Sequence, residues 1–312
     1  MRAVSIVIPN WNGEKQLKKN LPLLFNVLRR FRGESEVIII DDASTDKSRE
    51  FLRKLKKEKE KTGSRNLKII FNDYNVGFAE SVNRGIAKAQ YDVVFLLNTD
   101  VEVKEDCFDY LLPHFEKQDV FAVGANADWT LGIGRFIDGY LDISLPREVS
   151  RETKTPQKSF WVSGGHSAFD RQKWLALGGI DTLYAPFYFE ETDLCYRAWK
   201  RGWQVLWEPR ARVLHKHEES VIRKYFSPNY ISFIAQRNQL IFVWKNIADK
   251  RMLREHKKNF LRRIASEPKY LKVVLAAALK IPSILKRRKE ERDKAKRSDQ
   301  EIFDLFRKQK DS

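Results

Sequence analysis

Residues 91–100 read YDVVFLLNTD, an apolar run that ends on an amide, a hydroxyl and a carboxylate. The apolar part is rich in β-branched and aromatic side chains, which predicts a buried strand. In α/β sheets, ligands bind just outside the carboxyl ends of the strands. We therefore expect Asn98, Thr99 and Asp100 to lie at a ligand-binding edge of a sheet.

Short apolar runs and polar, helix-forming stretches alternate along the first half of the chain. This alternation is typical of crossover units in a mostly parallel sheet, and so it predicts the α/β class. The expected strands are 3–9, 35–41, 67–72, 91–97 and 120–126, and the expected helices are 14–31, 46–61, 78–89 and 105–118.

The pattern changes after residue 126. Residues 127–158 are interrupted by glycines and show no helical period, which indicates hairpins or irregular structure. The chain from about residue 228 is expected to be helical and basic. Between these parts we expect a strand at 159–165 that enters a glycine turn, helices at 170–179 and 190–202, and a strand at 203–209.

The positive charge of the chain is concentrated near its C-terminus. The net charge is +17, and residues 249–312 hold 21 Lys and Arg against 10 Asp and Glu. The densest run, residues 285–297, is either a solvated helix or a surface for anionic lipid headgroups. Nucleic acid is the weakest partner class, because no recognised binding motif accompanies these charges. The stretch 270–288 joins apolar residues to this cluster, so it is expected either to lie on a membrane surface or to pack against protein.

Several features favour a cytoplasmic protein. No run of 18 apolar residues predicts a transmembrane helix, and the start of the chain runs directly into a predicted strand without a signal-like apolar region. The two cysteines, Cys107 and Cys195, have no metal-type spacing and are expected to be reduced thiols. Peripheral attachment to the inner face of the cell membrane is compatible with these features.

Polar residues also follow the other predicted strands. Pro9 to Asn12 offer hydrogen bonds and a flat ring after the first strand, and Asp41 and Asp42 follow the second. The two acids can accept from a base or a ribose, or they can serve only as turn and cap residues. Gly77 permits a tight turn before a helix that carries Asn83.

A metal would complete a phosphate site at this edge. No glycine-rich phosphate loop of the GxGxxG or Walker type follows a predicted strand. Divalent cations take oxygen ligands, and Mg²⁺ commonly bridges one or two carboxylates to phosphates. We therefore predict that Asp100 binds a divalent ion and that the ion binds a diphosphate.

Six ordered motifs resemble those of family-2 glycosyltransferases, and most closely the rhamnosyltransferase-like branch with a GT-A fold. They are VSIVIPNWNG, VIIIDDASTD, NVGFAESVNRG, FLLNTDVEV, VSGGHSAFDRQKWLALGGID and FEETDLCYRAWKRGW, and they cover about residues 3–220. The resemblance implies a Rossmann-like catalytic domain at 1–225. Its nucleotide-binding half would be 1–126 and its acceptor half 127–225, followed by a basic helical extension at 226–312.

The resemblance implies inverting transfer of a sugar from a UDP- or dTDP-linked donor, with rhamnose as the branch-level candidate, to a glycan or a lipid-linked acceptor. Asp100 would ligate Mg²⁺ or Mn²⁺ with His215, or less favourably with His217; Asn98 replaces the first acid of the family's DxD motif. The residues implied in nucleotide-sugar binding are Pro9, Asn10, Trp11, Asn12, Asp41, Asp42, Gly77, Phe78, Asn83, Asn98, Thr99 and Asp100, and those beside the donor sugar and acceptor are Trp161, Ser163, Gly164 and Gly165.

The same resemblance assigns the catalytic base to Glu191, where the family usually has Asp. An inverting displacement needs a carboxylate to take the proton of the attacking hydroxyl, and a neighbouring acid such as Glu190 raises the pKa of that base. Asp193 is the fallback. The competing functions are a sugar-nucleotide nucleotidyltransferase and a non-catalytic protein that binds nucleotide sugars or nucleic acid. The oligomeric state is left open.

Overall fold

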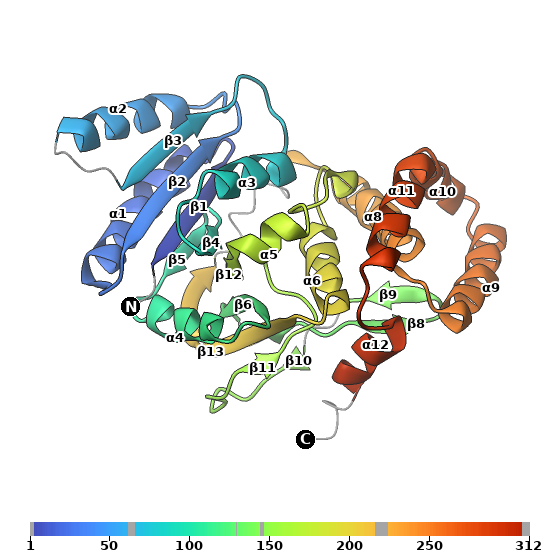
Figure 1. The fold of residues 1–312 in the computed structure, drawn as a ribbon. Helices are drawn as coiled ribbons and strands as arrows, with labels where there is room; N and C mark the ends of the chain where they lie inside the picture. The colour runs from blue at the N-terminus through green and yellow to red at the C-terminus, as the bar shows by residue number, and fades with distance from the viewer. Residues whose placement is uncertain (1–2, 62–65, 129, 144–146, 216–223, 308–312) are drawn as a thin grey trace.

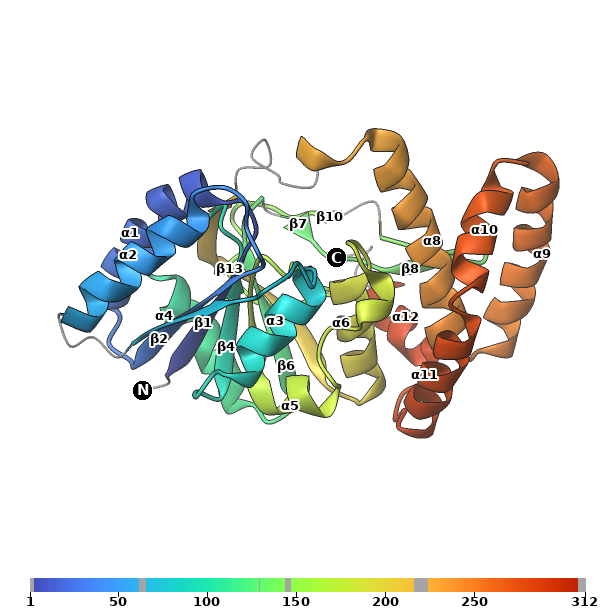
Figure 2. The same ribbon diagram turned by 90° about the horizontal axis from the view of Figure 1, so that it is seen from above.

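The computed structural model describes residues 3–61, 66–128, 130–143, 147–215 and 224–307 (Figure 1). Within these ranges, nine strands form one mixed sheet in the order β11-β13-β6-β12-β4-β1-β2-β3, with β5 paired to β13. Helices flank the sheet, and a group of C-terminal helices packs at one end of it (Figures 1 and 2). The predicted α/β class, with a mostly parallel sheet and a helical C-terminal region, is confirmed.

All five strands predicted for the first half are present in the sheet, each within two residues of its expected bounds. Two small hairpins, β7–β10 and β8–β9, stand apart from the sheet. The strands are β1 (Val4–Asn10), β2 (Ser35–Asp41), β3 (Leu67–Phe71), β4 (Val93–Leu97), β5 (Val101–Val103), β6 (Val120–Asn126), β7 (Thr130–Leu131), β8 (Arg135–Ile137), β9 (Tyr140–Asp142), β10 (Arg147–Glu148), β11 (Gln157–Lys158), β12 (His166–Asp170) and β13 (Gln204–His215).

The helices of the first half cover the two faces of the sheet, and those of the C-terminal part follow one another with short connections. The α-helices are α1 (Glu14–Arg30), α2 (Ser48–Lys61), α3 (Phe78–Ala87), α4 (Cys107–Leu111), α5 (Arg171–Ala176), α6 (Glu190–Lys200), α8 (Pro228–Asn246), α9 (Lys250–Ser266), α10 (Tyr270–Ala278), α11 (Ile281–Asp293) and α12 (Asp299–Arg307).

The direction of the strands determines where polar loops gather. Strands β1, β2, β3 and β4 are parallel, and their aliphatic side chains are buried. Asn10, the last residue of β1, lies opposite Asp41, the last residue of β2. Strand β12 runs antiparallel between β4 and β6. The carboxyl ends of the parallel strands therefore share one edge, as the sequence predicted.

Two expected elements are wrong in part. Residues 159–165 are not a strand: Ser159 N donates to Val205 O, whereas Phe160 N donates to Gly132 O, so the main chain changes partner and the strand begins only at His166. The apolar side chain of Phe160 is fully buried in the core. The helix expected at 105–118 ends as α4 and continues as a 3₁₀ turn (Leu112–Glu116), because proline near its start has no N–H to donate.

The C-terminal helices share their hydrophobic core with the sheet domain. Phe303 and Phe306 of α12 are buried in the cluster that also contains Phe160 and Trp199. The rings of Phe160 and Phe303 stack 5.7 Å apart. Full burial of one such side chain stabilises the fold by about 1.5–3 kcal/mol. The helices are thus an integral part of the folded unit.

No helix in the described ranges is long and apolar enough to cross a bilayer, and both cysteines are buried and free. Residues 270–288 are divided between α10 and α11, and Pro282 lies in the first turn of α11, where proline is tolerated.

A buried ionic cluster joins α6 to α8. The carboxylate of Asp193, which is fully buried, accepts from Arg197 Nε at 2.7 Å and from Lys245 Nζ at 2.7 and 2.8 Å. The hydroxyl of Tyr184 and the amide of Asn246 donate to the same carboxylate, each at 2.8 Å. Burial alone would raise the pKa of Asp193, but Lys245 and Arg197 outweigh it and hold the pKa below its usual range. A buried charge costs several kcal/mol unless it is paired and hydrogen-bonded in this way.

We expect Lys245→Met to lower the free energy of unfolding by about 3 kcal/mol, because it removes one partner of a buried charge. Chemical denaturation of the full chain measures this. Lys250→Met, at the exposed start of α9, is the matched control and is expected to change stability by less than about 0.5 kcal/mol. The double variant Asp193→Asn/Lys245→Met should recover part of the loss. A loss below about 1 kcal/mol in Lys245→Met would show that the cluster does not hold α6 to α8.

Candidate active site

The loops after β1 and β2 form one edge of the site. Asn10 Nδ2 donates to Asp41 Oδ2 at 2.9 Å and to Ser44 Oγ at 3.2 Å. The other amide atom, Oδ1, is buried without a hydrogen bond to the described residues, and a Cβ at Gly13 would lie 2.5 Å from it. Asp41 is fully buried and also faces Arg49 Nε at 3.7 Å. These hydrogen-bonded side chains form a polar surface at the carboxyl ends of β1 and β2.

Two predicted nucleotide contacts hold loops in place. Asn12, with a φ of 53°, accepts from the main-chain N–H of Thr45 at 2.8 Å. Asp42 accepts from the main-chain N–H of Val76 at 2.9 Å and of Gly77 at 2.8 Å. Both acceptors are therefore engaged by the backbone. Around them Pro9 is half-buried in β1, Trp11 is half-buried on the loop that follows, and Phe78 is half-buried at the start of α3.

Asn83 has a different role from the one expected. Its Nδ2 donates to Ile180 O at 2.8 Å, and its Oδ1 accepts from Ile180 N at 2.9 Å. A Cβ at Gly179 would lie 2.2 Å from Oδ1, so the neighbouring turn requires glycine there. Both polar atoms of the amide thus fasten α3 to the turn after α5, and the expected nucleotide contact is replaced by this one.

Asp100 and His215 lie together, as expected for a metal site. Asp100 Oδ2 is 3.5 Å from His215 Nε2, and Asp100 Oδ1 is buried without a hydrogen bond to the described residues. The hydrogen bond to Asp100 raises the pKa of His215. The ring of His166 lies 5.8 Å from that of His215. His217 falls outside the described residues.

Asp100 and His215 fit a divalent ion only if further ligands complete its coordination sphere. Carboxylate oxygen and imidazole nitrogen both bind Mn²⁺ or Mg²⁺. Among the described residues, no group of three or more His, Cys, Asp or Glu side chains is placed to hold a metal. Diphosphate and water oxygens would have to complete the coordination sphere, which fits an ion that binds together with a nucleotide.

Glu190 and Glu191 begin α6 after a strained turn. Tyr188 and Phe189, with φ angles of 70° and 75°, are in the left-handed region that L residues rarely adopt. Such strain costs about 1–3 kcal/mol per residue and persists only where the surroundings hold it, often at active sites. The turn therefore requires support from elsewhere in the fold.

Asn238 of α8 supplies that support. Its side chain is fully buried, and Nδ2 donates to the carbonyl oxygens of Tyr184, Phe187 and Tyr188 at 2.7, 2.9 and 2.8 Å. The adjacent Arg237 donates to Ala185 O at 2.5 Å. The sequence analysis missed this contact. The only local signal in the sequence is the polar Asn238, which lies just before the apolar run 240–243 of α8.

The two glutamates have raised pKa values. Burial and the charge of Glu191 raise the pKa of Glu190 well above its usual value, and Glu190 Oε2 has no hydrogen bond to the described residues. Burial also raises the pKa of Glu191, against the opposing effect of the main-chain N–H groups of Glu191 and Gly164. A carboxylate with a raised pKa is suited to accept a proton near neutral pH.

Asp193 is wrong as a fallback base. Its carboxylate is fully buried and forms ion pairs with Lys245 and Arg197. Its pKa is held below the usual range, opposite to the requirement for a base.

The glycine turn at 163–165 connects the two sides of the site. A Cβ at Gly164 would lie 2.4 Å from Glu191 Oε1, and a Cβ at Gly165 would lie 2.6 Å from Asn98 Nδ2. Gly165 N donates to Ser163 Oγ at 3.1 Å, and Asn98 N donates to Gly165 O at 2.8 Å. One turn thus touches both the strand end that carries Asn98, Thr99 and Asp100 and the glutamate at the start of α6.

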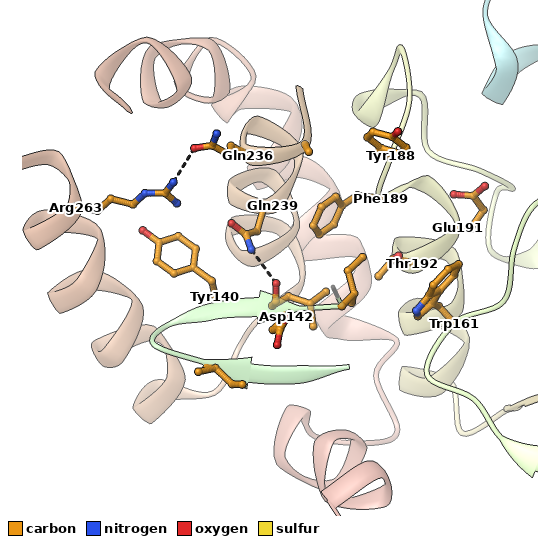
Figure 3. Close-up of a pocket in the computed structure, with 14 residues that line it drawn as sticks. Tyr140, Asp142, Trp161, Tyr188, Phe189, Glu191, Thr192, Gln236, Gln239 and Arg263 are labelled. Carbon is orange, nitrogen blue, oxygen red and sulfur yellow. Dashed lines mark hydrogen bonds between the residues drawn. The ribbon is translucent and has the colours of Figure 1, made fainter. Parts of the chain in front are cut away.

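A cavity of about 550 Å³ begins at Glu191 and extends between the β8–β9 hairpin and helices α8 and α9 (Figure 3). The hairpin turns at Asp138 and Gly139, both with positive φ. The predicted residue Trp161 lines the cavity; the sequence analysis missed the other lining residues. They are Ile137, Tyr140, Leu141, Asp142, Ile143, Tyr188, Phe189, Thr192, Ala235, Gln236, Gln239 and Arg263.

Solved structures with a similar fold include proteins crystallised with nucleotides or nucleotide sugars. Residues 1–349 of TarS from S. aureus in complex with UDP-GlcNAc match with a TM-score of 0.58 at 14% identity, covering 99% of this chain and 92% of that one. GalNAc-T7 with UDP, GalNAc and Mn²⁺ matches with a TM-score of 0.59 at 16% identity, covering 86% and 57%. At these identities the likeness shows the fold, which is that of GT-A glycosyltransferases.

Curated relatives and a family model identify the chain more closely. The poly-β-1,6-N-acetyl-D-glucosamine synthase of Staphylococcus aureus strain MSSA476 is 35% identical over 252 residues, which is 71% of this chain and 58% of the relative. That of strain COL is 29% identical over 275 residues, or 78% and 63%. The chain thus spans about three fifths of these relatives, which do not bear out the rhamnosyltransferase-like branch. The model described as glycosyl transferase family 2 matches residues 5–175, more than half of the chain. The chain belongs to glycosyl transferase family 2.

Proposed function

We propose that the chain transfers a sugar from a nucleoside diphosphate to an acceptor hydroxyl with inversion at the anomeric carbon. The observation that carries the proposal is the turn at 163–165, with Asn98 on one side and Glu191 on the other. A donor whose diphosphate lies at the strand ends would have its sugar beside this turn. An acceptor hydroxyl in the cavity would then lie between that sugar and Glu191.

The proposed step is a single displacement. The acceptor oxygen attacks the anomeric carbon, the bond from that carbon to the diphosphate oxygen breaks, and the acceptor proton passes to the Glu191 carboxylate. Asp100 and His215 would hold a divalent ion, which neutralises charge on the leaving diphosphate when it is bound. A protonated Glu190 would leave Glu191 as the carboxylate that accepts the proton.

The relatives support an N-acetylated sugar on a uridine carrier. TarS was crystallised with UDP-GlcNAc, and the curated relatives are named for a polymer of N-acetylglucosamine. We propose a UDP- or dTDP-linked hexose as the donor, with rhamnose kept as a member of the donor set to be tested. The proposed acceptor is a glycan or a lipid-linked sugar at the inner face of the cell membrane.

An exposed apolar face supports that location. Leu271 and Leu275 of α10 and Leu279, the residue after its last turn, follow one another at four-residue spacing, and Leu285 lies on α11; we call these four residues the leucine face. They are 47%, 57%, 85% and 58% exposed. Exposed lysines such as Lys272 flank the face. Apolar side chains beside basic ones suit an anionic bilayer surface, where each basic residue adds about 1 kcal/mol. Figure 2 shows α10 at the end of the molecule opposite α1 and α2.

For the base, we expect Glu191→Gln to lower kcat by about 10²- to 10⁴-fold, since the amide cannot accept the proton. Release of the nucleoside diphosphate, UDP from UDP-GlcNAc and dTDP from dTDP-linked donors, measures this. The exposed Glu58→Gln on α2 is the control. Because the pKa of Glu191 is raised, wild-type kcat/KM should fall with decreasing pH from a higher pH than an ordinary carboxyl would give. Unchanged turnover in Glu191→Gln would remove this residue from the role.

For the metal, we expect Asp100→Ala to weaken binding of UDP in the presence of Mn²⁺ by at least about tenfold, because the ion loses its only proposed carboxylate ligand. Without Mn²⁺ the variant and the wild type should bind UDP alike. Titration calorimetry with and without Mn²⁺ gives both values, and Asp106→Ala, exposed at the start of α4, is the control. An equal gain from Mn²⁺ in Asp100→Ala and wild type would place the metal elsewhere.

For the membrane surface, we expect Leu275→Asp/Leu279→Asp to reduce co-sedimentation with anionic liposomes at least tenfold, because two apolar side chains would be replaced by charges of the same sign as the lipid. Leu23→Asp, at an exposed position of α1, is the control. Point variants suit this test better than removal of the C-terminal helices, for example after residue 248. Such a truncation would remove α12, which is part of the shared core. Equal partitioning of the leucine-face variant and wild type would contradict the proposal.

A further inference from the structure

We propose that the cavity between Glu191 and Arg263 binds an uncharged oligosaccharide, so that the acceptor is a sugar chain of more than one unit. This inference rests on the proposed function and names the acceptor class of the same site. It also assigns the recognition of that acceptor to the β8–β9 hairpin and the C-terminal helices.

The cavity extends away from Glu191, the proposed base. Figure 3 shows Glu191 and Trp161 at one end and Arg263 at the other, with Tyr140 and Gln239 between them. The volume of about 550 Å³ lies in the range of small-molecule sites. A hydroxyl placed at Glu191 therefore leaves most of the cavity for further parts of the same acceptor.

Part of the cavity lies outside the segment that the family model matches. The family model ends at residue 175, whereas Gln236, Gln239 and Arg263 come from α8 and α9. The hairpin is pressed onto α9, because a Cβ at Gly139 would lie 2.4 Å from the Cα of His256. The shape of the cavity thus depends on the contact between hairpin and helix.

The lining combines flat rings with polar groups. Tyr140, Trp161, Tyr188 and Phe189 present aromatic faces, and Gln239 adds an amide. Sugars carry apolar C–H faces and a rim of hydroxyls, so they match both kinds of surface, and aromatic rings pack well on such faces. A hydrocarbon chain would offer no hydrogen-bond donor to Oε1 of Gln239, and covering a polar atom in that way is costly.

The charges of the cavity favour an uncharged ligand. Arg263 is the only basic residue of the lining, and its Nε lies 3.3 Å from Glu267 Oε2. The lining also contains the acids Asp142 and Glu191. A phosphate or carboxylate in the cavity would find Arg263 already paired with Glu267 and would face the carboxylate of Glu191. This distinguishes a neutral saccharide from an anionic acceptor.

The polar groups are fixed before a ligand binds. Gln239 Nε2 donates to Leu141 O at 2.9 Å, and Arg263 Nη2 donates to Gln236 Oε1 at 2.7 Å. The guanidinium of Arg263 also lies 3.9 Å from the ring centre of Tyr270. Oε1 of Gln239 has no hydrogen bond to the described residues and can accept from a sugar hydroxyl. Fixed groups lower the ordering cost of binding.

The test compares saccharides of different length in direct binding and in transfer. The probes are N-acetylglucosamine and its β-1,6-linked tetramer, glucose and its β-1,4-linked tetramer, and a phosphorylated form of the best tetramer. Titration calorimetry of the full chain without donor is expected to show at least tenfold tighter binding of one tetramer than of its monomer. Binding of the phosphorylated form at least as tight as that of the neutral tetramer would overturn the inference.

The variant Gln239→Met keeps the side-chain length but removes the amide, and Tyr140→Ala removes one ring. Either variant is expected to raise the KM for the tetramer at least tenfold and the KM for the monomer less than threefold. Gln90→Met, at an exposed position, is the control for Gln239→Met. An equal change for monomer and tetramer in both variants would overturn the inference.

The outcomes separate this inference from the proposed function. If the chain released no UDP from any donor but bound a tetramer in a Gln239-dependent way, the saccharide site would stand and the transferase proposal would fail. If the chain transferred sugar but bound no tetramer more tightly than its monomer, the transferase proposal would stand and the saccharide site would fail.

Discussion

The ionic cluster around Asp193 is the constraint on which the site depends. Asp193 lies two residues after Glu191 on α6, and its charge is stabilised in the core by Arg197 of the same helix and by Lys245, which reaches it from α8. A buried charge without a partner costs several kcal/mol, so α6 can occupy its position only when α8 occupies its own. Asn238, on the same helix as Lys245, then supports the strained turn before Glu190. The orientation of Glu190 and Glu191 is therefore set by a helix about fifty residues further along the chain.

The two sides of the site place acids in opposite environments. Asp100 faces an imidazole, and its Oδ1 has no hydrogen bond to the described residues, as expected for a ligand of a cation. Glu190 and Glu191 lie in a less polar setting, and their pKa values are raised by burial. Acids with divergent environments can perform different tasks within one reaction. The glycines of the turn at 163–165 allow these environments to approach each other without side chains between them.

The sequence was sufficient to predict the features that depend on local patterns, namely the buried strands and the polar residues at their ends. The buried strands of the first half were visible because β-branched runs alternate with helical stretches, and Asn10, Asp41 and Asn98 followed from the ends of those strands. The pairing of Asp100 with His215 came from the family resemblance, since the two are far apart in sequence. Local pattern misled at residues 159–165, where an aromatic and β-branched run is buried without forming a strand. Asn83 shows the same limit, because its partner Ile180 is 97 residues away. The support from Asn238 and the lining of the cavity likewise depend on contacts between distant segments.

The shared core has a consequence for how relatives of this chain can diverge. The helices α8 and α12 are not an appendage that recombination could exchange as a module, because they complete the packing of α6 and of the turn that precedes it. A chimera that exchanged only the segment after residue 226 would bring together an acid and a lysine that had not evolved with each other. The smallest exchangeable piece contains both α6 with its preceding turn and α8. New acceptor preferences are therefore more accessible through changes in the hairpin and in the outer turns of α8 and α9 than through replacement of the whole helical region.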